Sequence, residues 1–409
     1  MKVVFVLYKL GDVAVEPMTV TETETISQLK IAADIERLAD ALPRLFAAVR
    51  APAVREHPVW GTLIPYDVPT YGEGESLGHC VRPDIVVTED GLQVSEFDCV
   101  PSGRGFSLNV LGAEALQHEF LAPFDAWYAA MGVNRVLYGT ASRTTCWEET
   151  RLFSARLRDL FGRSIRPVNL DDTPRFDGVI DRLSYRSEMA SSRRRELCLE
   201  GAQVITAEPY LDSKMLFALV HDSAMETTLR SYMSVDQLTT LREMIPETYA
   251  VEQCSPEVRQ DIVGEFKQWV LKSTDVETDE CWGSRGTIIG RKYTRSKFSD
   301  VLSGDRPINN KDIGRHPVLQ RFAESCDFTS TWNRIAAGVE RAADQSQFAH
   351  ATHDIKPARK KVFARVGVYL LLSNTTQEVR VPPFAILTLR QDPLVHGAGD
   401  SVITVARMT

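Results

Sequence analysis

The apolar residues of this 409-residue chain change repeatedly between helical and extended spacing, and this alternation limits the fold more than any other feature. Residues 26–50, 113–131 and 148–161 carry apolar positions three and four residues apart, as on one face of an α-helix. Residues 2–8 and 135–140 are short runs rich in β-branched and aromatic side chains, which is typical of strands. Strands that alternate with helices favour an α/β (α+β) fold.

The alternation continues towards the C-terminus, and Gly and Pro divide it into sections. A chain of this length is sufficient for two or three domains, for which the changes in pattern suggest residues 1–130, 131–250 and 251–409. The remaining strands are predicted at 178–180, 202–205, 268–272, 362–372 and 385–389, and the remaining helices at 211–221, 235–244 and 296–302.

Charge and composition exclude several classes of protein. The formal net charge of −8 repels polyanions, so no nucleic-acid partner is expected. The longest apolar runs, such as 366–372, are far shorter than the roughly 20 residues of a membrane-spanning helix, so no membrane partner is expected. The seven cysteines are scattered without a Cys-x-x-Cys pair, which argues against a disulfide or zinc framework and favours the cytoplasm.

The most informative stretch begins at Arg82 and ends at Asp98, with two extended runs around an acidic turn. If residues 89–91 form a three-residue hairpin loop, Asp84 lies opposite Glu96 and Arg82 lies opposite Asp98. Side chains alternate between the two faces of a hairpin, so all four would project from one face.

Three carboxylates on one face, those of Asp84, Glu96 and Asp98, repel one another unless a cation lies between them. Oxygen-only ligands suit Mg²⁺, and Arg82 would add a fixed positive charge for a phosphate. Two alternatives stay open: a solvent-facing hairpin whose acids merely pair with Arg82, and a two-residue loop that places Asp84 and Glu96 on opposite faces.

A second segment has features of a phosphate-binding site. The predicted strand at 268–272 ends in Lys272, and about ten residues later a glycine-rich loop contains Gly283, Ser284, Arg285 and Gly286. Backbone N–H groups approach phosphates closely where side chains are absent. Taken alone, this segment is also compatible with a surface turn.

These two segments together resemble a known family. The hairpin contains an Arg-x-Asp motif that is followed, after eleven residues, by a Glu-x-Asp motif. This pattern is similar to the Arg-x-Asp and Glu-x-Asn signature of glutathionylspermidine synthetases, which are circularly permuted ATP-grasp ligases. Asp98 stands where that family has Asn. The lysine and glycine-rich loop also resemble the family, although the loop reads Gly-Ser-Arg-Gly here and lacks the family's glutamate. The hairpin precedes the lysine, as in the permuted branch.

The resemblance implies a permuted ATP-grasp fold with an additional α/β substrate-side domain at 131–250 and the nucleotide and lid region at 251–409. It implies an ATP-dependent carboxylate–amine ligase that forms an amide through an acyl phosphate and releases ADP and phosphate. ATP and Mg²⁺ would be its cofactors. An amino acid or short peptide is the expected substrate, and a homo-oligomer stays open. The implied roles are catalysis for Arg82, Mg²⁺ binding for Asp84, Glu96 and Asp98, and ATP binding for Lys272, Gly283, Ser284, Arg285 and Gly286. Three further residues are chosen by position. Arg365 faces away from the apolar residues of the predicted strand at 362–372 and is expected to reach an ATP phosphate, although a core-edge arginine stays open, and Ser102 and Arg104 lie just past the hairpin and are expected to contact the substrate.

Other interpretations compete with this one. An ATP-dependent small-molecule kinase would use the same groups, and a degenerate site would leave a non-catalytic nucleotide-binding protein. A mixed-fold binding protein without a nucleotide is a further alternative. The Gly-x-Ser-x-Gly match at 74–78 has no strand before it and no helix after it, which argues against a serine hydrolase. His350 and His353 lack a third metal ligand at a telling spacing, and the arginines at 193–195 fit a solvated helix face.

Overall fold

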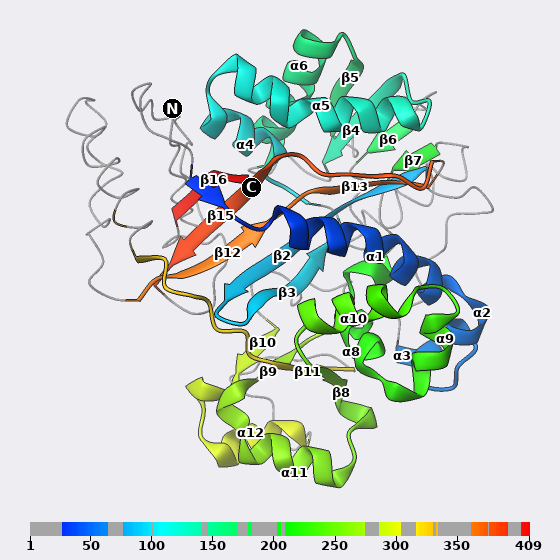
Figure 1. Ribbon diagram of the computed structural model, residues 1–409, viewed down its shortest axis with the longest axis vertical. Coiled ribbons are helices and arrows are strands. Elements are labelled where there is room, and N and C mark those ends of the chain that lie inside the picture. The colour runs from blue at the N-terminus through cyan, green and yellow to red at the C-terminus, as the bar shows by residue number, and fades with distance from the viewer. Residues whose placement is uncertain are drawn as a thin grey trace.

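Three β-sheets and the helices packed on them make up the described part of the chain (Figure 1). The structure is a computed structural model. It describes residues 27–63, 77–99, 101–140, 146–169, 179–181, 203–205, 209–274, 286–303, 316–329, 333, 361–374, 376–391 and 402–409. The predicted strand at 2–8, the loop residues 283–285 and the histidines at 350 and 353 lie outside these ranges.

The largest sheet lies in the middle of Figure 1 and carries the predicted hairpin. Strand β1 is parallel to β16, and all its other neighbouring pairs are antiparallel. Strands β12 and β13 pair in one continuous register with the same edge of β2, while β3 pairs with the other edge. The strands are β1 (Ser27–Leu29), β16 (Val402–Met408), β15 (Phe384–Arg390), β12 (Phe363–Gly367), β2 (Gly78–Thr88), β13 (Leu370–Ser373), β14 (Val379–Arg380) and β3 (Gly91–Asp98).

Both faces of the large sheet are apolar and covered by helices. In β15, Phe384 and Ile386 belong to one core, and Ala385 and Leu387 belong to another, as the twofold alternation of a strand requires. The first core includes α4 (Arg104–Leu111) and α5 (Glu114–Ala130). The second includes α1 (Ala32–Arg50), α8 (Met215–His221) and α10 (Val235–Met244).

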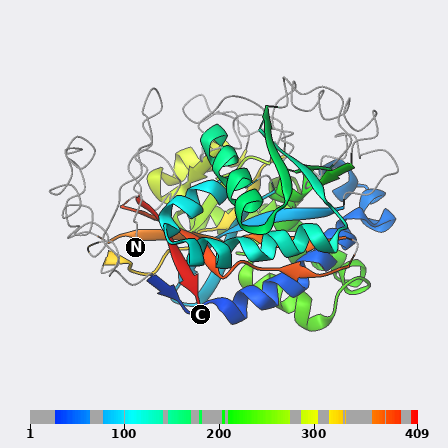
Figure 2. The same cartoon turned by 90° about the horizontal axis from the view of Figure 1, so that it is seen from above.

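A parallel sheet forms an α/β unit with α6 (Cys146–Phe161). In the view of Figure 2, this helix and the neighbouring helices α4 and α5 lie over the strands of the large sheet. Its strand order is β5-β4-β6-β7, and helix α5 joins its core to the large sheet. The strands are β4 (Arg135–Thr140), β5 (Ser164–Asn169), β6 (Val179–Asp181) and β7 (Gln203–Ile205).

A small antiparallel sheet with the order β10-β9-β11-β8 lies at the bottom of Figure 1. Helices α11 (Pro256–Gly264) and α12 (Arg295–Leu302) pack on it through a separate core. Ser255 and Thr294 cap these helices by accepting hydrogen bonds from backbone N–H groups of the first turn. The strands are β8 (Thr248–Ala250), β9 (Trp269–Lys272), β10 (Thr287–Ile289) and β11 (Val318–Arg321).

Short helices complete the described chain. They are α2 (Pro52–Arg55), α3 (Trp60–Leu63), α9 (Glu226–Arg230) and 3₁₀ turns at Pro209–Asp212, Ser223–Met225, Val251–Gln253, Phe266–Gln268 and Gly290–Lys292. None of the described helices is long and apolar enough to cross a lipid bilayer.

The predicted elements agree with these bounds at most positions. Strand β4 and helix α10 have the predicted limits. The predicted helix at 26–50 begins too early, because residues 27–29 form β1 against the distant strand β16. The predicted strand at 362–372 is divided into β12 and β13. The domain boundaries stay a prediction, although β12, β13, β15 and β16 join the sheet of the hairpin.

Candidate functional site

The hairpin of β2 and β3 brings Asp84 opposite Glu96, as predicted, but by a different route. Thr88 pairs with Gly91, so the loop has two residues and the predicted three-residue loop is wrong. Farther along, Ile85 pairs with Val94 while Asp84 pairs with Glu96, which leaves Ser95 as the extra residue of a β-bulge. The bulge restores the register that the shorter loop would have lost.

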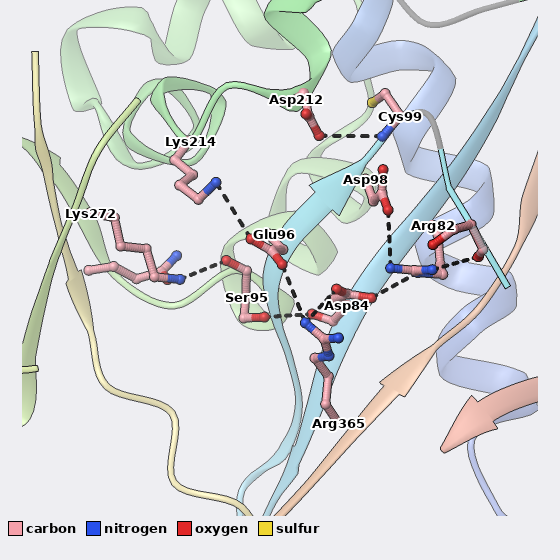
Figure 3. Close-up of polar contacts among 12 residues, drawn as sticks. Arg82, Asp84, Ser95, Glu96, Asp98, Cys99, Asp212, Lys214, Lys272 and Arg365 are labelled. Atoms are coloured by element: carbon pink, nitrogen blue, oxygen red, sulfur yellow. Dashed lines mark hydrogen bonds and ion pairs between the residues drawn. The ribbon is translucent and has the colours of Figure 1, made fainter. Parts of the chain in front are cut away.

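The bulge also decides which residues face the core. Leu92, Val94 and Phe97 belong to the same buried cluster as Ile85, so Leu92 and Val94 face away from the acids. The predicted three-residue loop, without a bulge, would have placed Leu92 and Val94 on the same face as Glu96. Asp84 lies on the opposite face of β2, at a place where polar groups interrupt the apolar surface. This polar face is the candidate site (Figure 3).

Arg82 is held by three partners. Its Nε donates to Asp84 Oδ1 at 3.0 Å, its Nη2 lies 3.1 Å from Asp98 Oδ2, and its Nη1 donates to the carbonyl oxygen of Ser102 at 2.8 Å. The side chain crosses Gly367, where an added Cβ would lie 2.9 Å from Arg82 Cδ. These contacts fix the guanidinium as a link between β2, β3 and the start of α4.

Arg365 from β12 bridges the two facing carboxylates. Its Nη1 lies 2.9 Å from Asp84 Oδ2 and 3.5 Å from Glu96 Oε1. Lys214, just before α8, lies with its Nζ 3.5 Å from Glu96 Oε2. Glu96 therefore has basic groups from two other elements around it, as Figure 3 shows.

Lys272 joins the small sheet to the hairpin. Its Nζ donates to the carbonyl oxygen of Ser95 at 2.9 Å and to Gln320 Oε1 at 2.6 Å. Ser95 in turn donates from its hydroxyl to the backbone oxygen of Asp84 at 2.9 Å. The bulge is therefore the point at which the predicted lysine and the predicted carboxylates meet.

A pocket of about 820 Å³, counting space open to solvent, lies between the hairpin, β12 and the small sheet. Among the described residues that line it, four side chains are basic, those of Lys214, Lys272, Arg321 and Arg365, and one is acidic, that of Glu96. A lining with this excess of positive charge favours an anionic ligand. The described residues around it are Val86, Ser95, Glu96, Lys214, Pro246, Val270, Lys272, Thr287, Ile289, Gln320, Arg321, Phe322, Ala323, Ser325, Ala364 and Arg365.

Burial and neighbouring charges shift the pKa values of the site in different directions. Burial opposes ionisation of Glu96, but Lys214 and Arg365 outweigh it and lower the pKa of Glu96 to about 2. Burial raises the pKa of Asp84 against the opposing effect of its arginines. Burial lowers the pKa of Lys272 to about 8 although Glu96 acts to raise it. Lys272 thus carries a proton that small changes in its surroundings can remove.

The oxygen donors fit a Mg²⁺ ion only in part. Asp84 and Glu96 face each other and already share a cationic group, Arg365, and Mg²⁺ commonly uses one or two carboxylates together with phosphate oxygens. Asp98 faces Arg82 instead. Among the described residues, no three His, Cys, Asp or Glu side chains gather closely enough to hold a metal ion. The assignment of all three acids as ligands stays a prediction.

The other predicted residues are placed differently. The carbonyl oxygen of Ser102 accepts bonds from Arg82 and Tyr369, close to the acids. Arg104 is 1% exposed and donates to Asp181 Oδ2 at 2.8 Å, so it faces the α/β unit and not the pocket. Gly286 is buried and directly precedes β10, while Gly283, Ser284 and Arg285 lie outside the described residues.

Several pocket residues were not found from the sequence. Gln320 holds Lys272, and Phe322 forms part of the wall. Gln320 lies in β11, a four-residue strand whose partners are distant in the sequence, and Phe322 directly follows it. The sequence Val-Leu-Gln-Arg of this strand carries no motif. Val270 and Ile289 are apolar residues of the pocket wall. Strand alternation predicts that they face the pocket only when the neighbouring strands of β9 and β10 are known.

The large mixed sheet and the small antiparallel sheet, with a basic pocket between them, define a protein of mixed α and β structure. No protein-family model and no curated protein matches the sequence. Among solved structures, a glutathione synthetase-like effector from Globodera pallida has a TM-score of 0.51 at 10% identity, over 97% of this chain and 92% of that chain. The chain is similar to that protein in fold.

A second solved structure is a candidate γ-glutamylcysteine synthetase from Methylobacillus flagellatus KT. Its TM-score is 0.43 at 11% identity, and the match covers 95% of this chain and 89% of that chain.

Proposed function

We propose that the protein is an ATP-dependent carboxylate–amine ligase with a permuted ATP-grasp fold. The observation that carries the proposal is the meeting of Lys272 from the small sheet with the bulge beside Glu96. This contact joins the two sequence segments that resemble glutathionylspermidine synthetases. The similarity in fold to a glutathione synthetase-like effector supports the same class.

The pocket offers suitable groups to both ends of a nucleotide. Lys214, Lys272 and Arg365 provide positive charge for a triphosphate. Val270, Ile289 and Phe322 provide apolar surface for a base. Small-molecule sites commonly combine apolar walls with a few convergent charged groups, and this pocket contains both.

Mg²⁺ would be held by Asp84, Glu96 and Asp98, of which Glu96 lines the pocket. A bound Mg²⁺ would supply positive charge to neutralise the charge that develops during phosphoryl transfer. The chain contributes by holding these carboxylates in place, and the lowered pKa of Glu96 keeps that one ionised.

In the proposed reaction, the substrate carboxylate attacks the γ-phosphate of ATP to give an acyl phosphate and ADP. An amine then attacks the acyl carbon, phosphate leaves and an amide remains. Lys272 and Arg365 would neutralise the transferred phosphoryl oxygens. Arg82, predicted as a catalytic group, has a partner at each guanidinium nitrogen and would instead position Asp84 and Asp98.

The proposal is tested by measuring ADP release with MgATP over a panel of amino acids and short peptides paired with amines. We expect MgATP-dependent amide product, and at least a hundredfold loss in Glu96→Ala, about 2.7 kcal/mol of barrier or more. Glu36→Ala removes an exposed glutamate of α1 and is the matched control, with unchanged rates expected. Comparable rates in Glu96→Ala would exclude Glu96 from the site. A phosphorylated product without amide would identify a kinase instead.

A further inference from the structure

Phe322 forms an aromatic wall of the pocket, and an arginine lies on its ring. Phe322 directly follows β11, and its backbone N–H donates to the carbonyl oxygen of Gln268 at 2.6 Å. The guanidinium carbon of Arg291 lies 3.8 Å from the centre of the Phe322 ring. This distance is well within the range of a cation–π interaction. The backbone bond fixes the residue, and the guanidinium covers part of its side chain.

Arg291 is held in an unusual way for an arginine. Its Nη1 lies 3.5 Å from Glu324 Oε2. Its Nε and Nη2 are buried and have no hydrogen-bond partner in the part of the chain that the structure describes. Buried donors without partners cost free energy, so another contact must hold the side chain there. The face of the Phe322 ring provides such a contact beside the ion pair with Glu324.

Arg291 also connects two parts of the pocket. It follows β10, whose residues Thr287 and Ile289 line the pocket, and it contacts the residue after β11. The stack therefore sets the position of Phe322 relative to β10. An aromatic ring supported in this way suits a flat ligand group, because rings stack through their faces.

We propose that Arg291 is a positioning residue that fixes Phe322 as a stacking wall, and that a flat heteroaromatic ring rests on this wall. The inference rests on the proposed function in that the base of ATP supplies this ring. It goes further by assigning base recognition to the Arg291 and Phe322 pair. The phosphates contact Lys272 and its basic neighbours. Binding of the base and binding of the phosphates can therefore be measured separately.

The test compares ATP with inorganic tripolyphosphate, which has no base, by calorimetry with Mg²⁺ present. In Arg291→Met we expect the Kd for ATP to rise about tenfold, the size of a partly desolvated cation–π contact. The Kd for tripolyphosphate should stay within about twofold. Phe322→Leu should give the same selective loss. Arg291→Lys keeps the charge and should recover part of the affinity for ATP.

The outcomes separate this inference from the proposed function. No binding of ATP by the wild-type protein would overturn the proposed function and this inference together. Binding of ATP and tripolyphosphate with equal affinity would overturn only the stacking wall. An equal loss for both ligands in Arg291→Met would also overturn it, because a general distortion affects both. If Arg291→Met does not fold, as judged by thermal unfolding, Arg291→Lys and Phe322→Leu provide the same comparison.

Discussion

The lowered pKa of Lys272 predicts that binding of MgATP weakens above pH 8. In the absence of ligand this lysine titrates at about 8, because burial disfavours its charged form. A triphosphate beside it stabilises the charged form, so ATP binds preferentially to the protonated protein. Below pH 8 the lysine is already protonated and the affinity should be nearly constant. Above pH 8 each unit should raise the Kd by up to about tenfold, about 1.4 kcal/mol.

The measurement is a set of MgATP titrations by calorimetry between pH 6.5 and 9.5. At pH 9 roughly nine in ten lysines at this position would be deprotonated before binding, given a pKa of about 8. Binding should then take up close to one proton. The number of protons follows from repeating the titration in two buffers of different ionisation enthalpy.

Lys272→Arg is the matched control, because its guanidinium stays charged throughout this range. If Lys272 is the titrating group, this variant binds MgATP with an affinity that changes little up to pH 9.5. A slope in Lys272→Arg equal to that of the wild-type protein would refute the assignment. A wild-type affinity that does not change between pH 7 and 9 would refute the lowered pKa itself.

Three further predictions concern the surroundings of the site. Gly367→Ala places a methyl group against Arg82, which its partners hold in place, and should lower the free energy of unfolding in urea by about 1–3 kcal/mol. Asp181→Asn leaves the buried charge of Arg104 without its counterion and should cost about 3 kcal/mol in the same assay, whereas a loss under 1 kcal/mol would contradict a structural role. The pKa of Glu96 falls from 4.5 to about 2 on folding, so its contribution to stability is present above pH 4.5 and is lost as the pH falls towards 2. As the pH is lowered from 5 to 3, the Tm of Glu96→Gln should therefore fall less than the Tm of the wild-type protein in thermal scans.

Local sequence was sufficient wherever an element carries its own signals. Helix α10 begins at a capping box formed by Ser234 and Gln237, and its bounds were predicted correctly. Strand β1 has three residues and exists because it pairs with β16 more than 370 residues later. Periodicity cannot reveal such a partner, so the sequence predicts a helix that includes the residues before Ala32.

Arg104 shows how a correct neighbourhood can give an incorrect contact. Its position two residues after Ser102 suggested a substrate-binding side chain beside the hairpin. The structure begins α4 at Arg104, and the side chain enters the α/β unit, where Asp181 and the rings of Phe124 and Tyr138 surround it. The direction in which the chain leaves β3 depends on how the large sheet packs against the α/β unit. The sequence of the hairpin alone does not predict this packing.

The pairing of Asp84 with Glu96 was predicted from a three-residue loop, and the structure reaches it with a two-residue loop and a bulge. Without the extra residue, Glu96 would share the face of Val94 and enter the apolar core, where a carboxylate is costly. The bulge is supported from outside the hairpin, because Lys272 donates to the carbonyl oxygen of Ser95. The same contact that aligns the acids also holds the lysine of the other sheet beside them. The register of the hairpin and the contact between the two sheets therefore both depend on the bulge at Ser95. A rule about the turn alone could predict the pairing of Asp84 with Glu96, but it could not predict the bulge that produces this pairing.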